Sequence, residues 1–388
     1  NLFPGVRDPD ALSAAVPKAQ LRSRLASALA AARGGEARRA ALNAFKDREM
    51  FRIDMRHILG YSGGFAQFSA ELTDLAEVVV GAAYDLCLGE LRAEHGVPLL
   101  EDGRPCASCI CALGKCGGRE LGFASDIELI FIFAGNGRTR GPRVITSAEF
   151  HEKAVVALTQ AIRTRREGIF EIDLRLRPYG QAGSMAVSLE SFRRYFAPGG
   201  PAWEYERQAL IKLRPIAGDL ALAQQVAQLR DEFVYGGSPL DLVALRGMRE
   251  RQIRHLVAGG TINAKFSPGG LVDLEYLVQG LQVMHGPRDP SLRLTNTREA
   301  IAALAAAGII SRDDYARLRE AHIFLRQLID ALRMVRGNAR DLTVPPAQSE
   351  EFWFLARRLG YGDDPARLQE DLLRQTASVQ ELARRLLG

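Results

Sequence analysis

The sequence predicts an α+β protein in which a mixed β-sheet domain is flanked by N-terminal helices and followed by a C-terminal helical bundle. Apolar residues recur at helical spacing through the first hundred residues and again from Leu220 onward. Between these regions the pattern changes to short apolar runs bounded by glycine and proline, which is typical of strands. We therefore expect a helical region over 1–99, a sheet domain over 100–217 and a bundle over 218–388.

Three helices are expected in the first region, over 21–33, 45–59 and 68–92. The second and third are separated by a glycine-containing turn at 60–64, and a Gly-Val-Pro sequence follows the third.

The middle region contains short apolar runs that predict strands over 109–113, 126–133, 169–177 and 184–187. A helix is expected over 147–166, between the second and third of these strands. The sheet should therefore mix parallel and antiparallel neighbours.

The last region contains its clearest helix over 315–336, where six apolar residues alternate three and four positions apart and form a packing seam. These residues are Leu318, Ala321, Leu325, Leu328, Leu332 and Val335. Two further helices are expected over 350–358 and 365–387, after the break at Pro345-Pro346.

Composition and charge indicate an ordinary globular protein, with 47% hydrophobic and 25% charged residues and a formal net charge of +5. The sequence contains neither an apolar run long enough for a membrane span nor a signal peptide. The odd number of cysteines, five, argues against a disulfide framework and favours a reducing cytoplasm. Because the chain starts at Asn1, we expect a trimmed chain or a piece of a longer protein.

Candidate catalytic residues lie where the second strand begins. Gly117 and Gly118 would let the backbone approach a phosphate closely. Asp126 and Glu128 stand two positions apart on a strand, so their side chains point to the same side, about 7 Å apart. Two carboxylates so placed can share hard cations, which predicts a metal site.

The third strand offers a complementary polar face. Asp173, Arg175 and Arg177 alternate with apolar residues and should point to one side together. The aspartate would complete the metal ligands, and the arginines would neutralise phosphate oxygens. A surface strand with internal salt bridges explains this strand alone equally well.

The ordered set of a glycine pair, Ser-Asp-x-Glu at a strand start and a later aspartate resembles the nucleotidyltransferase superfamily of the DNA polymerase beta kind. Longer stretches resemble the glutamine synthetase adenylyltransferase family more specifically. These are GKCGGRELGFASDIELIFIF, IDLRLRPYGQAG, AWEYERQALIKLRPIAGD and KFSPGGLVDLEYLVQ followed by LRLTNT. The resemblance extends from about residue 45 to residue 340.

The resemblance implies a nucleotidyltransferase domain with two Mg²⁺ ions held by Asp126, Glu128 and Asp173, and with ATP or ADP and phosphate as substrates. Residues expected to contact the nucleotide are Gly117, Gly118, Ser125, Arg175, Arg177, Lys212 and Arg214. Residues expected to support them are Lys115, Arg119, Asp273 and Glu275. Glu128 stands where the family more often has Asp, which keeps a ligand.

Family members attach AMP to a tyrosine of glutamine synthetase or remove it by phosphorolysis, usually with one unit for each reaction. This chain has a single unit, with features of both halves, so the direction stays open. Glutamine synthetase is the expected partner, and a PII-type signalling protein is a second candidate. The alternatives are a same-fold enzyme with another protein or RNA acceptor, and a non-catalytic regulatory module. Intact Asp126, Glu128 and Asp173 argue against the module.

Two other patterns in the sequence are better explained by structural roles. Cys106, Cys109, Cys111 and Cys116 match no common zinc spacing and have no nearby histidine, so buried apolar roles are expected. The arginine-rich stretch 163–166 lacks interleaved aromatic residues, which favours a solvated helix end over a nucleic-acid interface.

Overall fold

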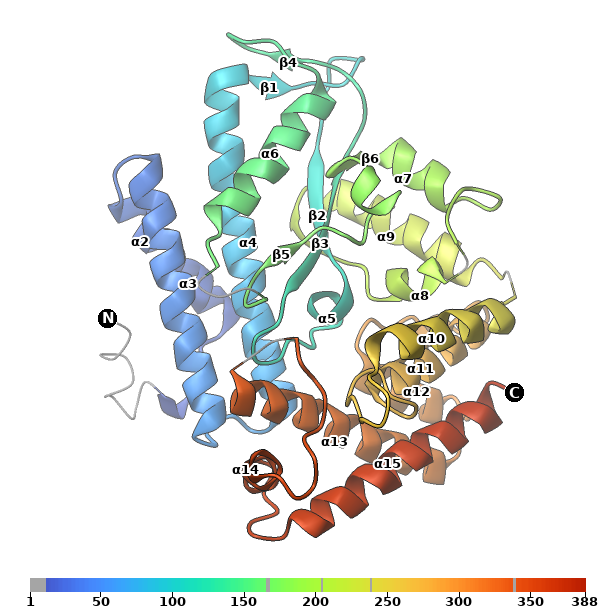
Figure 1. The fold of residues 1–388 in the computed structure, drawn as a ribbon. Helices are drawn as coiled ribbons and strands as arrows, with labels where there is room; N and C mark the ends of the chain where they lie inside the picture. The colour runs from blue at the N-terminus through green and yellow to red at the C-terminus, as the bar shows by residue number, and fades with distance from the viewer. Residues whose placement is uncertain (1–11, 165–167, 204, 238, 338–339) are drawn as a thin grey trace. The chain divides into compact units, whose positions relative to one another are not determined.

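The computed structural model describes residues 12–164, 168–203, 205–237, 239–337 and 340–388. Along the chain, helices precede and follow a mixed sheet, so the predicted α+β class is confirmed (Figure 1). The described residues form two compact units, one over 12–202 with 212–233, the other over 203–211 with 234–388. The predicted boundaries of the three regions, at residues 99 and 217, stay a prediction.

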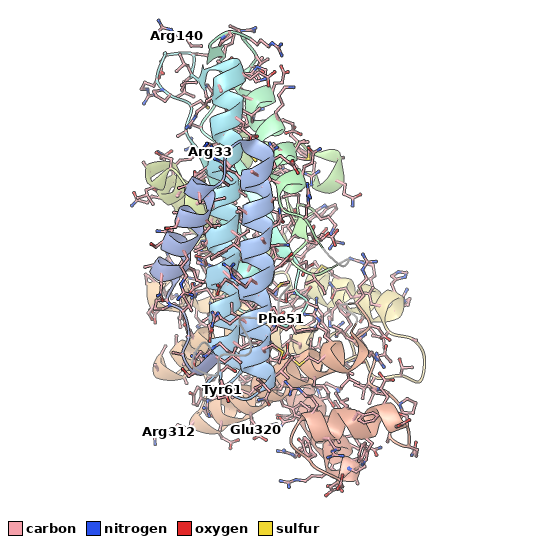
Figure 2. The ribbon with its side chains drawn as sticks, turned by 90° about the vertical axis from the view of Figure 1, so that its left-hand side faces the viewer. Arg33, Phe51, Tyr61, Arg140, Arg312 and Glu320 are labelled. Atoms are coloured by element: carbon pink, nitrogen blue, oxygen red, sulfur yellow. The ribbon has the colours of Figure 1, made fainter. Side chains whose placement is uncertain are left out.

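The first unit begins with three helices: α2 (Lys18–Ala31), α3 (Gly35–Ile58) and α4 (Phe65–His95). They confirm the three predicted helices and extend each of them toward its N-terminus. Figure 2 shows α3 running beside α4 from the loop after Arg33 to the turn near Tyr61.

The mixed sheet is built around one strand, β3, which pairs with neighbours on both of its edges. Its strands are β2 (Ser108–Ala112), β3 (Ile127–Phe133), β5 (Ile172–Asp173), β6 (Ala186–Ser188) and β7 (Arg214–Gly218). On one side β2 runs antiparallel to both β3 and β7. On the other side β5 pairs in parallel with the start of β3, and β6 pairs in parallel with its end. The sequence analysis did not predict β7.

The first unit also contains further helices and short strands. They are β1 (Val97–Pro98) paired with β4 (Thr139–Arg140), the one-turn α5 (Gly114–Gly117), α6 (Ser147–Ala161), η2 (Gly180–Ala182), α7 (Leu189–Phe196) and α9 (Leu220–Tyr235). α6 begins where the Thr146 side chain accepts a hydrogen bond from the Glu149 N–H, a common N-cap arrangement.

The predicted strand over 169–177 is wrong for most of its length, because only Ile172–Asp173 pairs with β3. Downstream, the polar side chains bond to their own loop. The Asp173 carboxylate accepts from the Arg175 backbone N–H, and the Arg177 guanidinium donates to the Leu174 and Gly183 carbonyls. Such local bonds compete with a strand ladder, and Leu176 is exposed instead of buried.

The predicted helix over 147–166 ends early, at Ala161. Two α3 side chains hold the departing chain. Asn43 donates to the Ala161 carbonyl and accepts from the Arg163 N–H, and the Lys46 ammonium donates to the Arg163 carbonyl. These bonds satisfy polar groups that a longer helix would have paired internally. Arg165 and Arg166 lie outside the described residues.

The core of the first unit contains a buried histidine. His151 on α6 stacks against Phe133 of β3, with ring centroids 5.0 Å apart. Burial lowers the pKa of His151 to about 4, from an ordinary value of 6.5. The folded protein therefore holds this imidazole neutral at pH values where the unfolded chain protonates it.

We expect the free energy of unfolding to fall in mild acid because of His151. The unfolded state takes up the proton first, so stability declines between pH 6.5 and about 4, by about 3 kcal/mol in total. In urea titrations at pH 7.0 and 4.5, a His151→Leu variant should lose less stability than the wild type. Equal losses in both proteins would contradict this origin of the acid sensitivity.

The second unit consists of helices. They are α8 (Glu206–Ile211), α10 (Leu242–Leu256), α11 (Leu271–His285), η3 (Pro290–Leu292), α12 (Thr297–Ala306), α13 (Arg312–Arg336), α14 (Glu350–Arg358) and α15 (Pro365–Leu386). The seam predicted on α13 is confirmed, because Leu318, Leu325 and Leu328 are fully buried in the unit's apolar core. Val335, the last seam residue, is only half-buried.

Over the described residues, no helix combines the length and the apolar character needed to cross a membrane.

Candidate active site

Three carboxylates meet at the start of β3. Asp126 directly precedes this strand, Glu128 lies on it, and Asp173 pairs beside Glu128 on the parallel strand β5. One carboxylate oxygen from each residue lies within 4.8 Å of the other two, and all three residues are half-buried. The structure thus brings together all three residues that the sequence analysis predicted as metal ligands.

Two cations contact this acidic cluster. The Lys115 ammonium lies 3.0 Å from Asp126 Oδ1, and the Lys115 backbone N–H donates to Glu128 Oε2 over 3.2 Å. Arg175 makes a side-on pair with Asp173, with its Nε 2.9 Å from both carboxylate oxygens. This hydrogen-bonded contact with Asp173 raises the pKa of Arg175. Lys115, which was predicted as a supporting residue, thus contacts two of the three carboxylates.

Gly114 is a site residue that the sequence analysis missed. Its φ of +48° is unfavourable for other residue types, and a Cβ at this position would fall 1.4 Å from Glu128 Oε2. Only glycine therefore leaves room for the Glu128 carboxylate where the structure places it. The signal in the sequence was a glycine directly after a buried strand, next to the more conspicuous Gly117-Gly118 pair.

Gly117 and Gly118 are both buried in the turn formed by α5. Their N–H groups donate to the carbonyls of Leu113 and Gly114, inside the same turn. A Cβ on Gly117 would fall 1.8 Å from the Lys212 carbonyl oxygen, so this glycine permits close packing against the chain that enters β7. Their predicted contact with phosphate stays a prediction.

Ser125 is buried in the loop between α5 and β3, and its hydroxyl accepts a hydrogen bond from the Gly122 N–H. Arg119 and Ala124 in this loop adopt left-handed backbone conformations, with φ of 57° and 52°. Non-glycine residues adopt such conformations at a cost of about 1 kcal/mol each, and they gather at functional sites. The loop leading to Asp126 is therefore held in one particular shape.

Of the remaining predicted cations of the first unit, Arg177 bonds to carbonyls of its own loop, and the other three lie in ion pairs. Lys212 Nζ is 2.7 Å from Glu120 Oε2, and both side chains are buried. Arg214 Nη2 is 2.6 Å from Glu77 Oε1, and Arg119 Nη2 is 2.9 Å from Asp74 Oδ1. The structure thus surrounds the site loop with charge pairs.

Asp273 and Glu275 belong to helix α11 of the second unit. Asp273 lies in the first turn of that helix, where it accepts from the Gly269 N–H and pairs with Arg249. This arrangement is typical of an acidic residue that stabilises a helix start, and neither residue is part of the three-carboxylate cluster.

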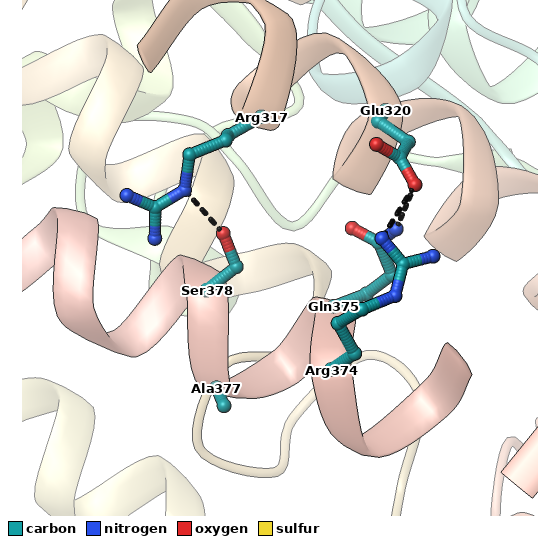
Figure 3. A pocket seen from close by; sticks show the side chains of 6 residues that line it. All are labelled: Arg317, Glu320, Arg374, Gln375, Ala377 and Ser378. Carbon is teal, nitrogen blue, oxygen red and sulfur yellow. Dashed lines mark hydrogen bonds and ion pairs between the residues drawn. The ribbon is translucent and has the colours of Figure 1, made fainter. Parts of the chain in front are cut away.

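A pocket of about 480 Å³ lies between α13 and α15 of the second unit (Figure 3). The side chains that line it bond mainly to one another. Arg374 and Gln375 both contact the Glu320 carboxylate, and Arg317 donates to the Ser378 hydroxyl. Because these polar groups already satisfy one another, the acidic cluster on β3 is the better candidate for chemistry.

The predicted burial of Cys106, Cys109, Cys111 and Cys116 is confirmed, because all four side chains are buried. Among the described residues, the side chains that are close enough together to hold a metal ion are those of Asp126, Glu128 and Asp173.

Comparison with protein families gives two matches along the chain. Residues 2–229 match the family described as glutamate-ammonia ligase adenylyltransferase, which covers more than half of the sequence. The chain belongs to this family. The adenylyltransferase match contains all three carboxylates, and residues 245–387 separately match a family described as GlnD PII-uridylyltransferase.

Known relatives of this adenylyltransferase family member are named bifunctional glutamine synthetase adenylyltransferase/adenylyl-removing enzyme. The protein from Stenotrophomonas maltophilia strain K279a is 36% identical over 304 residues, which is 77% of this chain and 32% of that protein. The protein from Bordetella pertussis strain Tohama I is 34% identical over 366 residues, which is 89% of this chain and 38% of that protein. The chain spans about a third of the length of these relatives.

Proposed function

We propose that this chain is a Mg²⁺-dependent nucleotidyltransferase that moves AMP between a nucleotide and a tyrosine of glutamine synthetase. The observation that carries the proposal is the cluster of Asp126, Glu128 and Asp173, with an oxygen of each within 4.8 Å of the others. The family membership and the names of the relatives support AMP as the transferred group and glutamine synthetase as the acceptor.

The three carboxylates suit a hard divalent cation. Oxygen ligands lie about 2.1 Å from Mg²⁺, so two ligands on opposite sides of one ion are about 4.2 Å apart. A spread of 4.8 Å needs only small side-chain movements to reach this geometry. When bound, Mg²⁺ would neutralise phosphate oxygens and lower the pKa of the attacking hydroxyl.

The neighbouring cations would orient the reactants. Arg175 is two-thirds exposed beside Asp173, so its guanidinium can reach phosphate oxygens as well as the carboxylate. Lys115 would hold Asp126 in place and add positive charge where negative charge develops during transfer. Ser125, with Gly117 and Gly118, is proposed to limit how the phosphates can lie.

A partner and a cellular location are also proposed. A PII-type protein is a proposed partner, because the region 245–387 matches a family whose description names PII. The cytoplasm is the proposed location, because free cysteines suit a reducing compartment.

A two-way labelling experiment tests the proposed function and its direction. The purified chain is incubated with Mg²⁺, α-labelled ATP and glutamine synthetase, and separately with labelled, adenylylated glutamine synthetase and inorganic phosphate. We expect label to be attached in the first reaction or released in the second. Nucleotide binding without either signal would point to another acceptor. Loss of nucleotide binding as well would indicate a non-catalytic module.

A further inference from the structure

Glu77 is a buried carboxylate on α4 that the proposed mechanism does not use. Three cations from different parts of the first unit converge on it. Lys18 of α2 donates to its Oε2, while Arg119 and Arg214 approach its Oε1 to 3.4 and 2.6 Å. Burial alone would raise the pKa of Glu77, but Arg214 and Lys18 outweigh burial and lower it. The carboxylate is therefore ionised at neutral pH.

Arg214 connects this carboxylate to the site loop. Its Nη2 bonds to Glu77 Oε1 and also to the Cys116 carbonyl over 3.0 Å, and its Nε bonds to the Gly117 carbonyl over 2.9 Å. These carbonyls end the one-turn helix α5, where the last backbone acceptors lack partners within the helix. An arginine held by a carboxylate on one side thus fixes the end of α5 on the other.

The beginning of α5 contacts the acidic cluster directly. Lys115 donates through its backbone N–H to Glu128 and through its ammonium to Asp126, and Gly114 provides the space for Glu128. Because α5 is a single turn, a shift at its Cys116 and Gly117 carbonyls would also move Lys115, one or two residues away. Displacement of Lys115 would change the separation of two proposed metal ligands.

We infer that Glu77 is a positioning residue, which acts through Arg214 and α5 to hold Asp126 and Glu128 in the geometry that binds a divalent cation. The inference rests on the proposed function for its biological meaning, but it can be measured as metal affinity alone. Residues that hydrogen-bond directly to metal ligands typically change metal affinity or activity by 10- to 100-fold. Glu77 lies further from the ligands, so its effect should fall at the lower end of this range.

The test uses Mn²⁺ as the probe, with its affinity for the purified chain measured by electron paramagnetic resonance. Glu77→Gln keeps the shape of the side chain and removes its charge, so we expect Mn²⁺ affinity to fall about tenfold. Arg214→Lys keeps the charge but cannot span the carboxylate and both carbonyls, so it should weaken Mn²⁺ binding in the same direction. The double variant should be no more than about twofold weaker than the worse single variant, because both changes break one route.

Glu90→Gln is the matched control. It makes the same chemical change on the same helix, α4, at a carboxylate that pairs with Arg39 of α3. Its Mn²⁺ affinity should stay within about twofold of wild type, and circular dichroism should show every variant to be folded. If Glu77→Gln does not fold, Arg214→Lys decides the question.

Wild-type Mn²⁺ affinity in a folded Glu77→Gln variant, or in Arg214→Lys, would overturn the inference. If the double variant lost as much Mn²⁺ binding free energy as the two single variants together, Glu77 would not act through Arg214. If the wild type binds Mn²⁺ but transfers no label to or from glutamine synthetase, the proposed function fails while the role of Glu77 can still be judged. A wild type that does not bind Mn²⁺ would overturn both.

Discussion

Replacing Asp126 with Asn should reduce AMP transfer, in whichever direction the chain catalyses it, by about a thousandfold. Asn keeps the size of the side chain but removes the negative charge that a divalent cation needs. Metal-assisted charge stabilisation is worth several kcal/mol, and a loss of about 4 kcal/mol corresponds to about a thousandfold in rate. The measurement is the initial rate of label transfer at saturating Mg²⁺ and nucleotide.

Asp102→Asn provides the matched control for this prediction. Asp102 is an exposed aspartate in the same unit, and it pairs with Arg104 within its own turn. The same chemical change at that position should leave the rate within about twofold of wild type. An Asp126→Asn variant that is folded and retains more than a tenth of the wild-type rate would contradict the assignment of Asp126 as a metal ligand.

Replacing Gly114 with Ala should be nearly as damaging, although the side chain that it adds is a single methyl group. The new Cβ would occupy the position of Glu128 Oε2, so the carboxylate must rotate away from the cluster. We expect the rate to fall about a hundredfold or more, because the site loses one of three anionic ligands. Mn²⁺ binding should weaken in parallel, which separates loss of the metal from loss of the acceptor.

Gly103→Ala separates the steric effect from the backbone effect. Gly103 also has a positive φ, of +83°, but a Cβ there would have no neighbour within 4 Å. Both variants bear a conformational cost of about 1 kcal/mol, and only Gly114→Ala should lose Mn²⁺. If both variants bound Mn²⁺ equally well, the proposed conflict between Gly114 and Glu128 would be refuted.

The sequence predicted those parts of the site that depend on strand periodicity. Asp126 and Glu128 stand two positions apart at the start of a strongly apolar strand, so their common side followed from backbone geometry alone. The structure also brings Asp173 to this cluster, although most of the strand predicted around it is absent. The pairing of Glu128 with Asp173 needs only two residues of β5, and that much of the strand exists.

Other features could not be read from the sequence because they depend on contacts between distant segments. Arg177 appeared to belong to the polar face of a strand, but it bonds to carbonyls of its own loop. The close approach of Gly117 to the Lys212 carbonyl, far along the chain, is a packing constraint that the glycine pair alone did not reveal. The sequence analysis did not single out Glu77, because the three cations that approach it lie at distant positions, 18, 119 and 214.

The way β5 and β6 share one edge of β3 has an evolutionary consequence. β5 fixes Asp173 at the start of β3, while β6 returns the chain to the same edge at Phe131–Phe133. The segment between them is therefore anchored at both ends on one strand. Insertions or deletions in this connection can therefore change its length and shape without changing the register that aligns Asp173 with Glu128. Members of such a lineage could diverge in this connection while the alignment of the two carboxylates stays in place.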